Sequence, residues 1–173
     1  MEYFDIYNDK KEKTGRTLPR KGSFLKEGEY QLIVLAIIER PDHRFLITQR
    51  SLDKKWAAGV WEVSGGGVHA GESSFEAVCR EVQEETGLDV SKAEGRCVYT
   101  YSNVDLERGD NYFVDIYHFH MDFTDADVII QESEAIAYRI ADWKEITELF
   151  NSAGFMHYER ILQAFDAEGY SVS

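Results

Sequence analysis

The sequence predicts an α/β (α+β) fold in which helices cover a mixed β-sheet. Apolar, β-branched runs occur at 31–38 and 44–50. Residues 72–86 have helical periodicity, and two further helical patterns lie near the end of the sequence. Strands, one central helix, more strands and terminal helices therefore follow one another, and this order is typical of a mixed sheet with helices packed against it.

Residues 1–173 are expected to form one domain, because this length is sufficient for a single hydrophobic core. Residues 1–30 are interpreted as an N-terminal extension. A strand at Tyr3–Tyr7, a charged turn and the glycine-containing TGRTLPRKG are consistent with a β-hairpin there. Residues 31–173 would then contain the core and two C-terminal helices.

The core elements are assigned in chain order. QLIVLAII (31–38) and RFLITQR (44–50) predict a hairpin, and VWEVSGGG (60–67) predicts a short strand that runs into a glycine loop. Ser73 or Ser74 can cap the helix at 72–86, and Gly87 is placed to end it. The remaining predictions are strands at 97–103, 112–123 and 135–140, and helices at 143–154 and 156–169.

The composition limits the classes of partner. A net charge of -13 argues against general affinity for nucleic acid or for a membrane surface, since both are polyanionic. The longest apolar run, Leu32–Ile38, is too short to span a bilayer, and the N-terminus lacks the layout of a secretory signal. Cys79 and Cys97 are expected to be buried thiols in a reducing compartment, so the cytoplasm is the expected location. A phosphorylated substrate would need a locally held cation.

A carboxylate cluster is predicted on the helix at 72–86. With Glu81 set to zero and about 100° per residue, Glu84 falls near about −60° and Glu85 near about +40°. Phe75, with Val78, Cys79 and Val82, is placed on the adjacent arc, which is predicted to be buried. Like charges this close repel, and a divalent cation with oxygen ligands, Mg²⁺ or Mn²⁺, would relieve the repulsion. The alternative is an ordinary solvated glutamate face, but Gly65, Gly66 and Gly67 just upstream favour a ligand site.

Residues 66–88 resemble the Nudix box, G-x5-E-x7-R-E-U-x-E-E-x-G-U, in which U is aliphatic. The match occurs at Gly66, Glu72, Arg80, Glu81, Val82, Glu84, Glu85, Gly87 and Leu88. The flanking sequence is similar to a Nudix domain from about residue 30 to residue 143. This resemblance implies an α/β/α sandwich around a central mixed sheet, with the box forming a loop-helix-loop.

The resemblance also implies site residues. Glu81, Glu84 and Glu85 would bind the metal, with a backbone carbonyl of Gly65 or Gly66, while Arg80 and Glu72 would brace the helix. The reaction would be attack of a metal-activated water on a small-molecule diphosphate. The general base is predicted to come from the later loop, with Glu132 as first choice and Glu134 as second, or from the box itself as Glu84 or Glu85.

Basic residues beside the glycine segment are candidates for phosphate binding. Arg50, Lys54 and Lys55 lie between a strand and the glycines, although a solvated basic turn is the alternative. The candidates with weaker support are Arg16, Arg20 and Lys21. Trp56 and Trp61 are expected in the core, with stacking on a base as the alternative. Tyr99, Tyr101 and Tyr112 are expected to pack on the sheet, with lining of a pocket as the alternative.

The opening residues and LITQRSLDKKWAAGVWEVSGGG resemble the isopentenyl-diphosphate-isomerase-like branch of the family. Its isomerases need a cysteine and a histidine in the segment before the box helix, where this chain has Gly65-Gly66-Gly67, and a histidine in the first core strand, near Gln31 here. Hydrolysis is therefore favoured over isomerisation. A module that binds a diphosphate without turnover remains the alternative, and a homodimer through the extension is expected by family analogy.

His118 and His120 alternate on one face of a predicted strand. Two histidines at this spacing can bind a metal, but no third ligand is evident from the sequence. We therefore favour an ordinary packing role for them.

Overall fold

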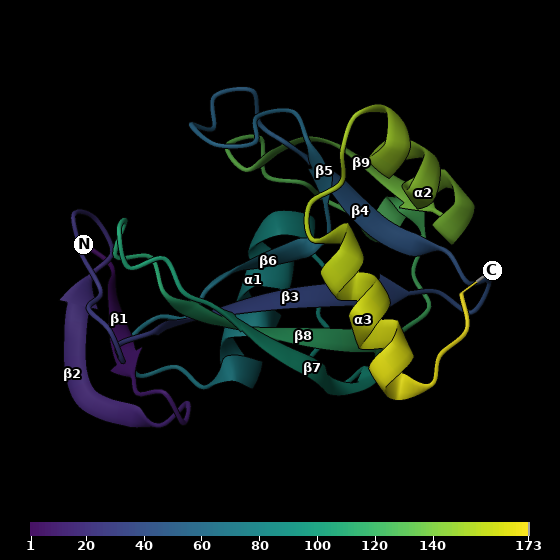
Figure 1. Cartoon of the computed structure of the whole chain (residues 1–173). Helices are drawn as coiled ribbons and strands as arrows, with labels where there is room; N and C mark the ends of the chain where they lie inside the picture. The colour runs from purple at the N-terminus through teal and green to yellow at the C-terminus, as the bar shows by residue number, and fades with distance from the viewer. Residues whose placement is uncertain (173) are drawn as a thin grey trace.

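The computed structural model describes residues 1–172. Its elements follow the predicted order (Figure 1). They are β1 (Tyr3–Tyr7), β2 (Lys13–Pro19), β3 (Gln31–Glu39), β4 (Phe45–Arg50), β5 (Trp61–Glu62), β6 (Ser64–Gly67), α1 (Ser74–Thr86), β7 (Glu94–Asn103), β8 (Tyr112–His120), a 3-10 turn (Asp125–Asp127), β9 (Ala135–Ala141), α2 (Trp143–Ser152) and α3 (Tyr158–Glu168).

A seven-stranded mixed sheet forms the middle layer. Its main path is β5-β4-β3-β8-β7, with β6 paired to β3 and β9 paired to β4. The β3–β8 pair is parallel and the other pairs are antiparallel, so the predicted mixed sheet is confirmed. The predicted hairpin of β3 and β4 is paired in register only at Glu39 and Phe45, and β6 pairs with residues 33–36 of β3.

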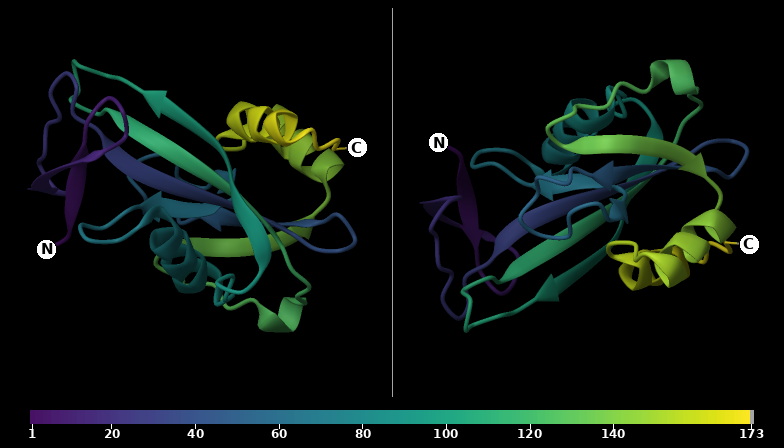
Figure 2. Two further views of the ribbon diagram at one scale, coloured as in Figure 1. Left: turned by 90° about the horizontal axis from the view of Figure 1, so that it is seen from below. Right: turned by 90° about the horizontal axis from the view of Figure 1, so that it is seen from above.

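Helices cover both faces of the sheet (Figure 2). On one face, α1 packs its apolar residues Ala77, Val78 and Val82 against Val34 of β3. On the other face, α2 and α3 close a second core that contains Ile116 of β8. Since β3 and β8 are buried on both sides, their nearly continuous apolar sequence follows from their central position. The α/β/α sandwich is therefore confirmed.

The N-terminal residues form the β1–β2 hairpin, which has a small apolar cluster of its own, Phe4, Ile6 and Leu25. Lys11 extends from this hairpin and pairs with the buried carboxylate of Asp115 on β8 at 2.7 Å. The backbone N–H of Ala70, just before α1, donates to the carbonyl of Tyr3 at 2.8 Å. The hairpin is thereby attached next to the glycine-rich strand and the start of α1.

Four sequence expectations were wrong. The triple glycine is not a loop, because Gly65–Gly67 form part of β6 and pair with β3. Phe75 is 42% exposed, since the apolar face of α1 is narrower than expected. Trp56 is 67% exposed in the loop between β4 and β5. Cys97 is exposed on β7 and Cys79 is only partly buried, so they are free cysteines but not buried thiols.

Candidate active site

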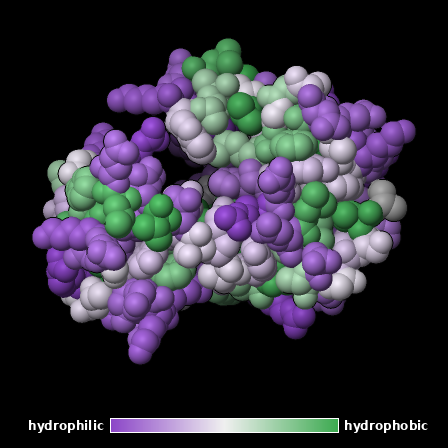
Figure 3. All heavy atoms as spheres, viewed as in Figure 1, coloured by the Kyte–Doolittle hydropathy of each residue, from purple (hydrophilic) through white to green (hydrophobic). Residues whose placement is uncertain are grey.

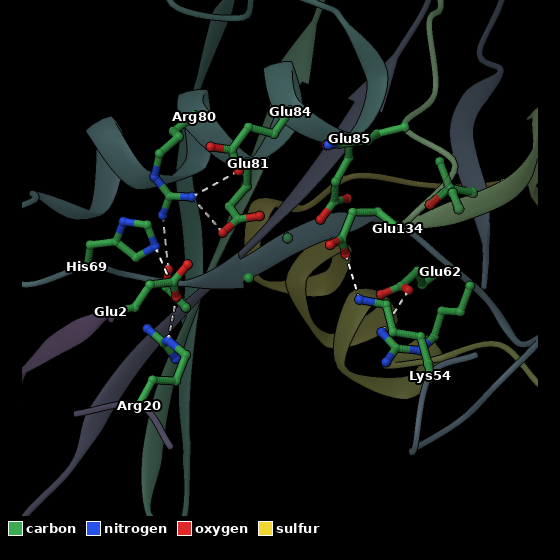
Figure 4. Close-up of a pocket in the computed structure, with 17 residues that line it drawn as sticks. Glu2, Arg20, Lys54, Glu62, His69, Arg80, Glu81, Glu84, Glu85 and Glu134 are labelled. Atoms are coloured by element: carbon green, nitrogen blue, oxygen red, sulfur yellow. Dashed lines mark hydrogen bonds and ion pairs between the residues drawn. The ribbon is translucent and has the colours of Figure 1, made fainter. Parts of the chain in front are cut away.

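Local sequence sets the start and end of α1. Ser73 caps the helix by accepting from the Glu76 N–H, and the Glu76 side chain accepts from the Ser73 N–H in return. This capping box satisfies backbone donors that would otherwise lack partners. Gly87 ends the helix with a φ of 76°, a conformation that costs glycine little. Figure 4 shows Glu81, Glu84 and Glu85 on the helix between these two caps, where they line one pocket.

The three glutamates of α1 face a cleft of about 390 Å³. The cleft is also lined by the β6 glycines, by β4 and β5, by the end of the β1–β2 hairpin and by the loop before β9. In Figure 3 the surface is hollowed on the side of this hairpin. Six glutamates and four basic residues line the cleft: Glu2, Glu62, Glu81, Glu84, Glu85, Glu134, Arg20, Arg50, Lys54 and Arg80.

Burial and mutual repulsion disfavour the charged forms of the inner carboxyls. Burial, then the charges of Glu81 and Glu62, raise the pKa of Glu85 well above its usual value, against the hydrogen bond from the Gly65 backbone. Burial also raises the pKa of Glu81, in spite of Arg80, and that of Glu62, in spite of Arg50. Oxygen donors whose ionised forms repel one another fit a hard divalent cation such as Mg²⁺ or Mn²⁺.

Arg80 connects the helix to the loop that precedes it. Its Nε and Nη2 donate to the two oxygens of Glu72 at 2.7 and 2.9 Å, and its Nη1 donates to Glu81 at 2.9 Å. Its Nη2 also donates to the Gly67 carbonyl at 3.1 Å. The hydrogen bond to Glu72 contributes most to raising the pKa of Arg80, so the guanidinium is a permanent charge. Arg80 therefore orients Glu81 within the cleft.

The glycines of β6 have no side chains, so Glu81 of α1 and Arg20 of the hairpin can approach this strand closely. A Cβ at Gly66 would lie 2.5 Å from the carboxyl carbon of Glu81, and one at Gly67 would lie 2.3 Å from Nη1 of Arg20. At Gly65 the obstacle would be backbone, since a Cβ would lie 2.2 Å from the carbonyl oxygen of Val34. The glycines are thus needed for the fit between α1, the hairpin and the sheet.

Basic side chains line the other walls of the cleft, each paired with an acid. Arg50 Nη1 lies 3.0 Å from Glu62 Oε2, and Lys54 Nζ lies 2.7 Å from Glu134 Oε2. Arg20 reaches in from the hairpin, and its Nε lies 3.1 Å from Glu2 Oε2. Figure 4 shows Arg20 with Glu2, and Lys54 with Glu134, on the walls of the cleft around the glutamates of α1.

The predicted site residues fall into two groups. Those that line the cleft are Gly65, Gly66, Arg50, Lys54, Arg80, Glu81, Glu84, Glu85 and the second-choice base Glu134. Those outside it are Glu132 and Lys55, which are exposed, and Glu72, which lies behind Arg80. Arg16 pairs with Glu29 at 2.7 Å, and Lys21 is exposed, so neither reaches the cleft.

Sequence reasoning missed Glu62 and underrated Arg20. Glu62 lies three residues before the triple glycine, and an acid in an otherwise apolar strand was the available signal. Arg20 depends on how the hairpin packs, and no local pattern shows this. Trp61 is buried, as expected, and Tyr112 packs against the core while it also lines a neighbouring cavity.

That neighbouring cavity, of about 580 Å³, shares the β6 glycines, Arg20 and Arg50 with the cleft. Trp56, Tyr112 and Arg108 also line it. The Arg50 guanidinium lies 5.7 Å from the Trp56 ring centroid. Within the described residues 1–172, neither Cys79 nor Cys97 lines the cleft or this neighbouring cavity.

Fold and site together define a hydrolase of the Nudix class: a sandwich whose box helix faces a glycine strand across a glutamate-lined cleft. Residues 29–165 match the NUDIX domain family. An uncharacterized Nudix hydrolase of Listeria monocytogenes is 31% identical over 167 residues, covering 96% of this chain and 95% of the relative. The chain belongs to the Nudix hydrolase family.

Solved structures agree with this assignment. The MutT protein of Methanosarcina mazei Go1 is 27% identical, with a TM-score of 0.64 over 86% of this chain and 100% of its own. A Deinococcus radiodurans protein is 19% identical with a TM-score of 0.73, covers 96% of this chain and 99% of its own, and supports the fold alone. Within residues 1–172, no helix has the length and apolarity needed to cross a membrane.

Proposed function

We propose that this protein hydrolyses the diphosphate linkage of a small organic or nucleoside diphosphate derivative, with Mg²⁺ or Mn²⁺ as cofactor. The observation that carries this proposal is the facing arrangement in one cleft of the α1 glutamates and the basic residues of the other walls. Carboxylates hold a cation, and guanidinium and ammonium groups bind phosphate oxygens, so one cleft provides both halves of diphosphate recognition.

Glu81, Glu84 and Glu85 would hold the cation, with a backbone carbonyl of Gly65 or Gly66. When bound, the cation supplies Lewis-acid stabilisation of phosphoryl oxygens and lowers the pKa of a water ligand. Arg80 and Glu72 keep Glu81 oriented through their paired hydrogen bonds.

We assign the general base to Glu134 in preference to Glu132. Glu134 lines the cleft and is held by Lys54, whereas Glu132 is exposed outside it. A base must come within hydrogen-bond reach of the water that it deprotonates, and Glu134 satisfies this requirement better. A box glutamate, Glu84 or Glu85, is the remaining alternative.

Phosphate groups would contact Arg20, Arg50 and Lys54, each of which would exchange a carboxylate partner for a phosphate oxygen. Lys55 is exposed and outside the cleft, so we assign it no direct contact. The organic part of the substrate would extend into the neighbouring cavity, where the exposed Trp56 offers a flat apolar face. This placement supports a substrate with a planar group, such as a nucleoside.

Hydrolysis is favoured over isomerisation because neither cysteine lines the cleft. That this chain belongs to the isopentenyl-diphosphate-isomerase-like branch remains a proposal. It concerns the ancestry of the chain and not the reaction that it catalyses. The cytoplasm also remains a proposal. So does the homodimer, which sedimentation equilibrium would test directly.

A panel of diphosphate compounds tests the proposed activity. Nucleoside triphosphates, nucleoside diphosphate sugars, dinucleoside polyphosphates and isoprenyl diphosphates are incubated with Mg²⁺ or Mn²⁺ in H₂¹⁸O, and product masses identify the cleaved bond. Metal-dependent incorporation of one ¹⁸O into a phosphate product is expected. Saturable binding of a compound without any product would instead favour the non-catalytic sensor.

Glu134→Gln and Glu132→Gln form a matched pair for the general base. The two substitutions make the same charge change in the same loop, but only Glu134 lines the cleft. We expect Glu134→Gln to lower kcat about 100-fold or more, the usual contribution of a general base, and Glu132→Gln to have little effect. Equal effects of the two substitutions would contradict the assignment.

A further inference from the structure

A second group of metal-binding residue types lies at the ends of β3 and β8. Glu39 is the last residue of β3, and the parallel register places it opposite His120 of β8. His118, two residues earlier, points to the same side of the sheet. The potential ligand atoms of Glu39, His118 and His120 lie within 4.8 Å of one another. The structure thus supplies the third ligand that the sequence alone did not show.

This group is separate from the Nudix cleft. Its side chains lie on the sheet face that α3 covers, where the His118 ring contacts Phe165 and Tyr170 edge-on. The cleft lies on the opposite face, between α1 and β6, and none of the three residues lines it. Figure 2 shows α1 and α3 on opposite sides of the sheet.

His118 has the arrangement of a supported ligand. Its side chain is fully buried, and Nδ1 lies 2.8 Å from Glu168 Oε2 at the end of α3. Its other nitrogen, Nε2, lies 2.7 Å from Glu39 Oε1, and the ring centroids of His118 and His120 are 4.3 Å apart. A carboxylate behind one ring nitrogen, with the other nitrogen facing further ligands, is the usual environment of a metal-binding histidine.

The other two ligands differ in exposure, because His120 lies next to solvent whereas Glu39 is buried. His120 is 43% exposed, and its Nδ1 lies 4.0 Å from Glu39 Oε1. Glu39 also accepts hydrogen bonds from His43 and Tyr170 through its second oxygen. A cavity of about 320 Å³ opens beside Glu39 and His120, and its lining includes the acidic Glu94 and Asp122 together with Arg40, which is paired with Asp42. A cation therefore has an entry path on this side.

We propose that Glu39, His118 and His120 form a binding site for a transition-metal dication of the Zn²⁺ type. Two imidazole nitrogens and one carboxylate oxygen are the donors that Zn²⁺ accepts, and Mg²⁺ prefers oxygen alone. The cation takes the place of the proton between His118 Nε2 and Glu39, so binding releases that proton to solvent. Three protein ligands leave a fourth position open towards the cavity.

Zn²⁺ binding to the full chain tests the proposal. Equilibrium dialysis with metal analysis is performed in excess Mg²⁺, which competes for the carboxylates of the cleft. About one Zn²⁺ per chain is expected, and Co²⁺ in its place is expected to show the visible absorption of a nitrogen-ligated ion. His120→Ala should lower the affinity at least about tenfold, and Glu168→Ala, which removes the carboxylate behind His118, roughly 10- to 100-fold.

Two variants serve as controls. His157→Asn removes a histidine at the other end of α3, at a residue whose φ of 62° asparagine tolerates, and should leave Zn²⁺ affinity unchanged. Glu85→Gln alters the cleft and should also retain Zn²⁺ binding. Thermal unfolding of the metal-free proteins checks that His120→Ala is folded, as its exposed position predicts. Loss of Zn²⁺ binding in Glu85→Gln, full binding in folded His120→Ala, or no bound Zn²⁺ in the wild-type chain would overturn the proposal.

Discussion

Replacing Glu85 with glutamine is expected to stabilise the metal-free protein while it removes most of the activity. Burial and the charges of Glu81 and Glu62 raise the pKa of Glu85 well above its usual value. A carboxyl whose pKa is raised in the folded state contributes stability fully below its unfolded pKa of about 4.3, and this stability is lost as the pH rises through the folded pKa. Glutamine cannot ionise, so it avoids the loss.

The expected change in the free energy of unfolding depends on pH and on metal. At pH 8 the free energy of unfolding of metal-free Glu85→Gln should be larger than that of wild type. The expected difference is about 1 kcal/mol, a typical gain for one favourable substitution. Below about pH 4 the two proteins should converge, because Glu85 is protonated in both states there. Saturating Mg²⁺ should stabilise the wild type more than the variant, since the variant lacks a ligand.

Glu85→Gln should impair catalysis, and this effect should be larger in free energy than the gain in stability. Removing one preorganised electrostatic group from a transition state costs about 2.7–4 kcal/mol, or roughly 10²–10³-fold in kcat. Urea unfolding with and without Mg²⁺, together with initial rates on the best substrate of the panel, gives both quantities. Glu84→Gln is the matched control for stability, because it makes the same change on the same helix at a side chain that is 53% exposed.

Two results would refute this reasoning. If metal-free Glu85→Gln is less stable than wild type at pH 8, the carboxyl is not strained in the folded state. If the variant keeps wild-type turnover, Glu85 does not hold the catalytic metal.

Three more predictions concern the cleft and the cavity beside it. Gly66→Ala places a Cβ 2.5 Å from the Glu81 carboxyl, so Mg²⁺ affinity should fall about tenfold or more by calorimetry with the fold retained, whereas Gly65→Ala meets backbone and should mainly lower the melting temperature. Equal melting temperatures for the two variants would contradict this. Arg80→Lys loses the bidentate contact with Glu72, so it should lower the free energy of unfolding by about 2 kcal/mol and also reduce kcat. An unchanged kcat would show that the orientation of Glu81 by Arg80 is unimportant. Trp56→Ala should raise KM about tenfold at constant kcat if the ring stacks on substrate, and an unchanged KM would exclude that contact.

The sequence alone was sufficient for the elements whose cause is local. The helix that carries Glu81 and Glu85 follows from apolar spacing, from Ser73 at its start and from Gly87 at its end, all within a few residues of one another. The clustering of Glu81, Glu84 and Glu85 follows from the same spacing, because i, i+3 and i+4 positions share a helix face. Their metal-binding role, and the bracing role of Arg80 and Glu72, are implied only by the resemblance to the Nudix box. The two-sided burial of β3 is likewise implied by its unbroken apolar run.

The tertiary structure decided which distant residues meet. Glu134 lines the cleft and Glu132 does not, although both are loop acids two positions apart. Arg20 enters the cleft through packing of the hairpin, and Glu39 meets His118 through a parallel register over 79 residues of separation. Such contacts depend on strand pairing and on the direction in which each loop leaves the sheet. Neither is encoded in a short window of sequence, because the energy that selects them comes from burial shared across the whole core.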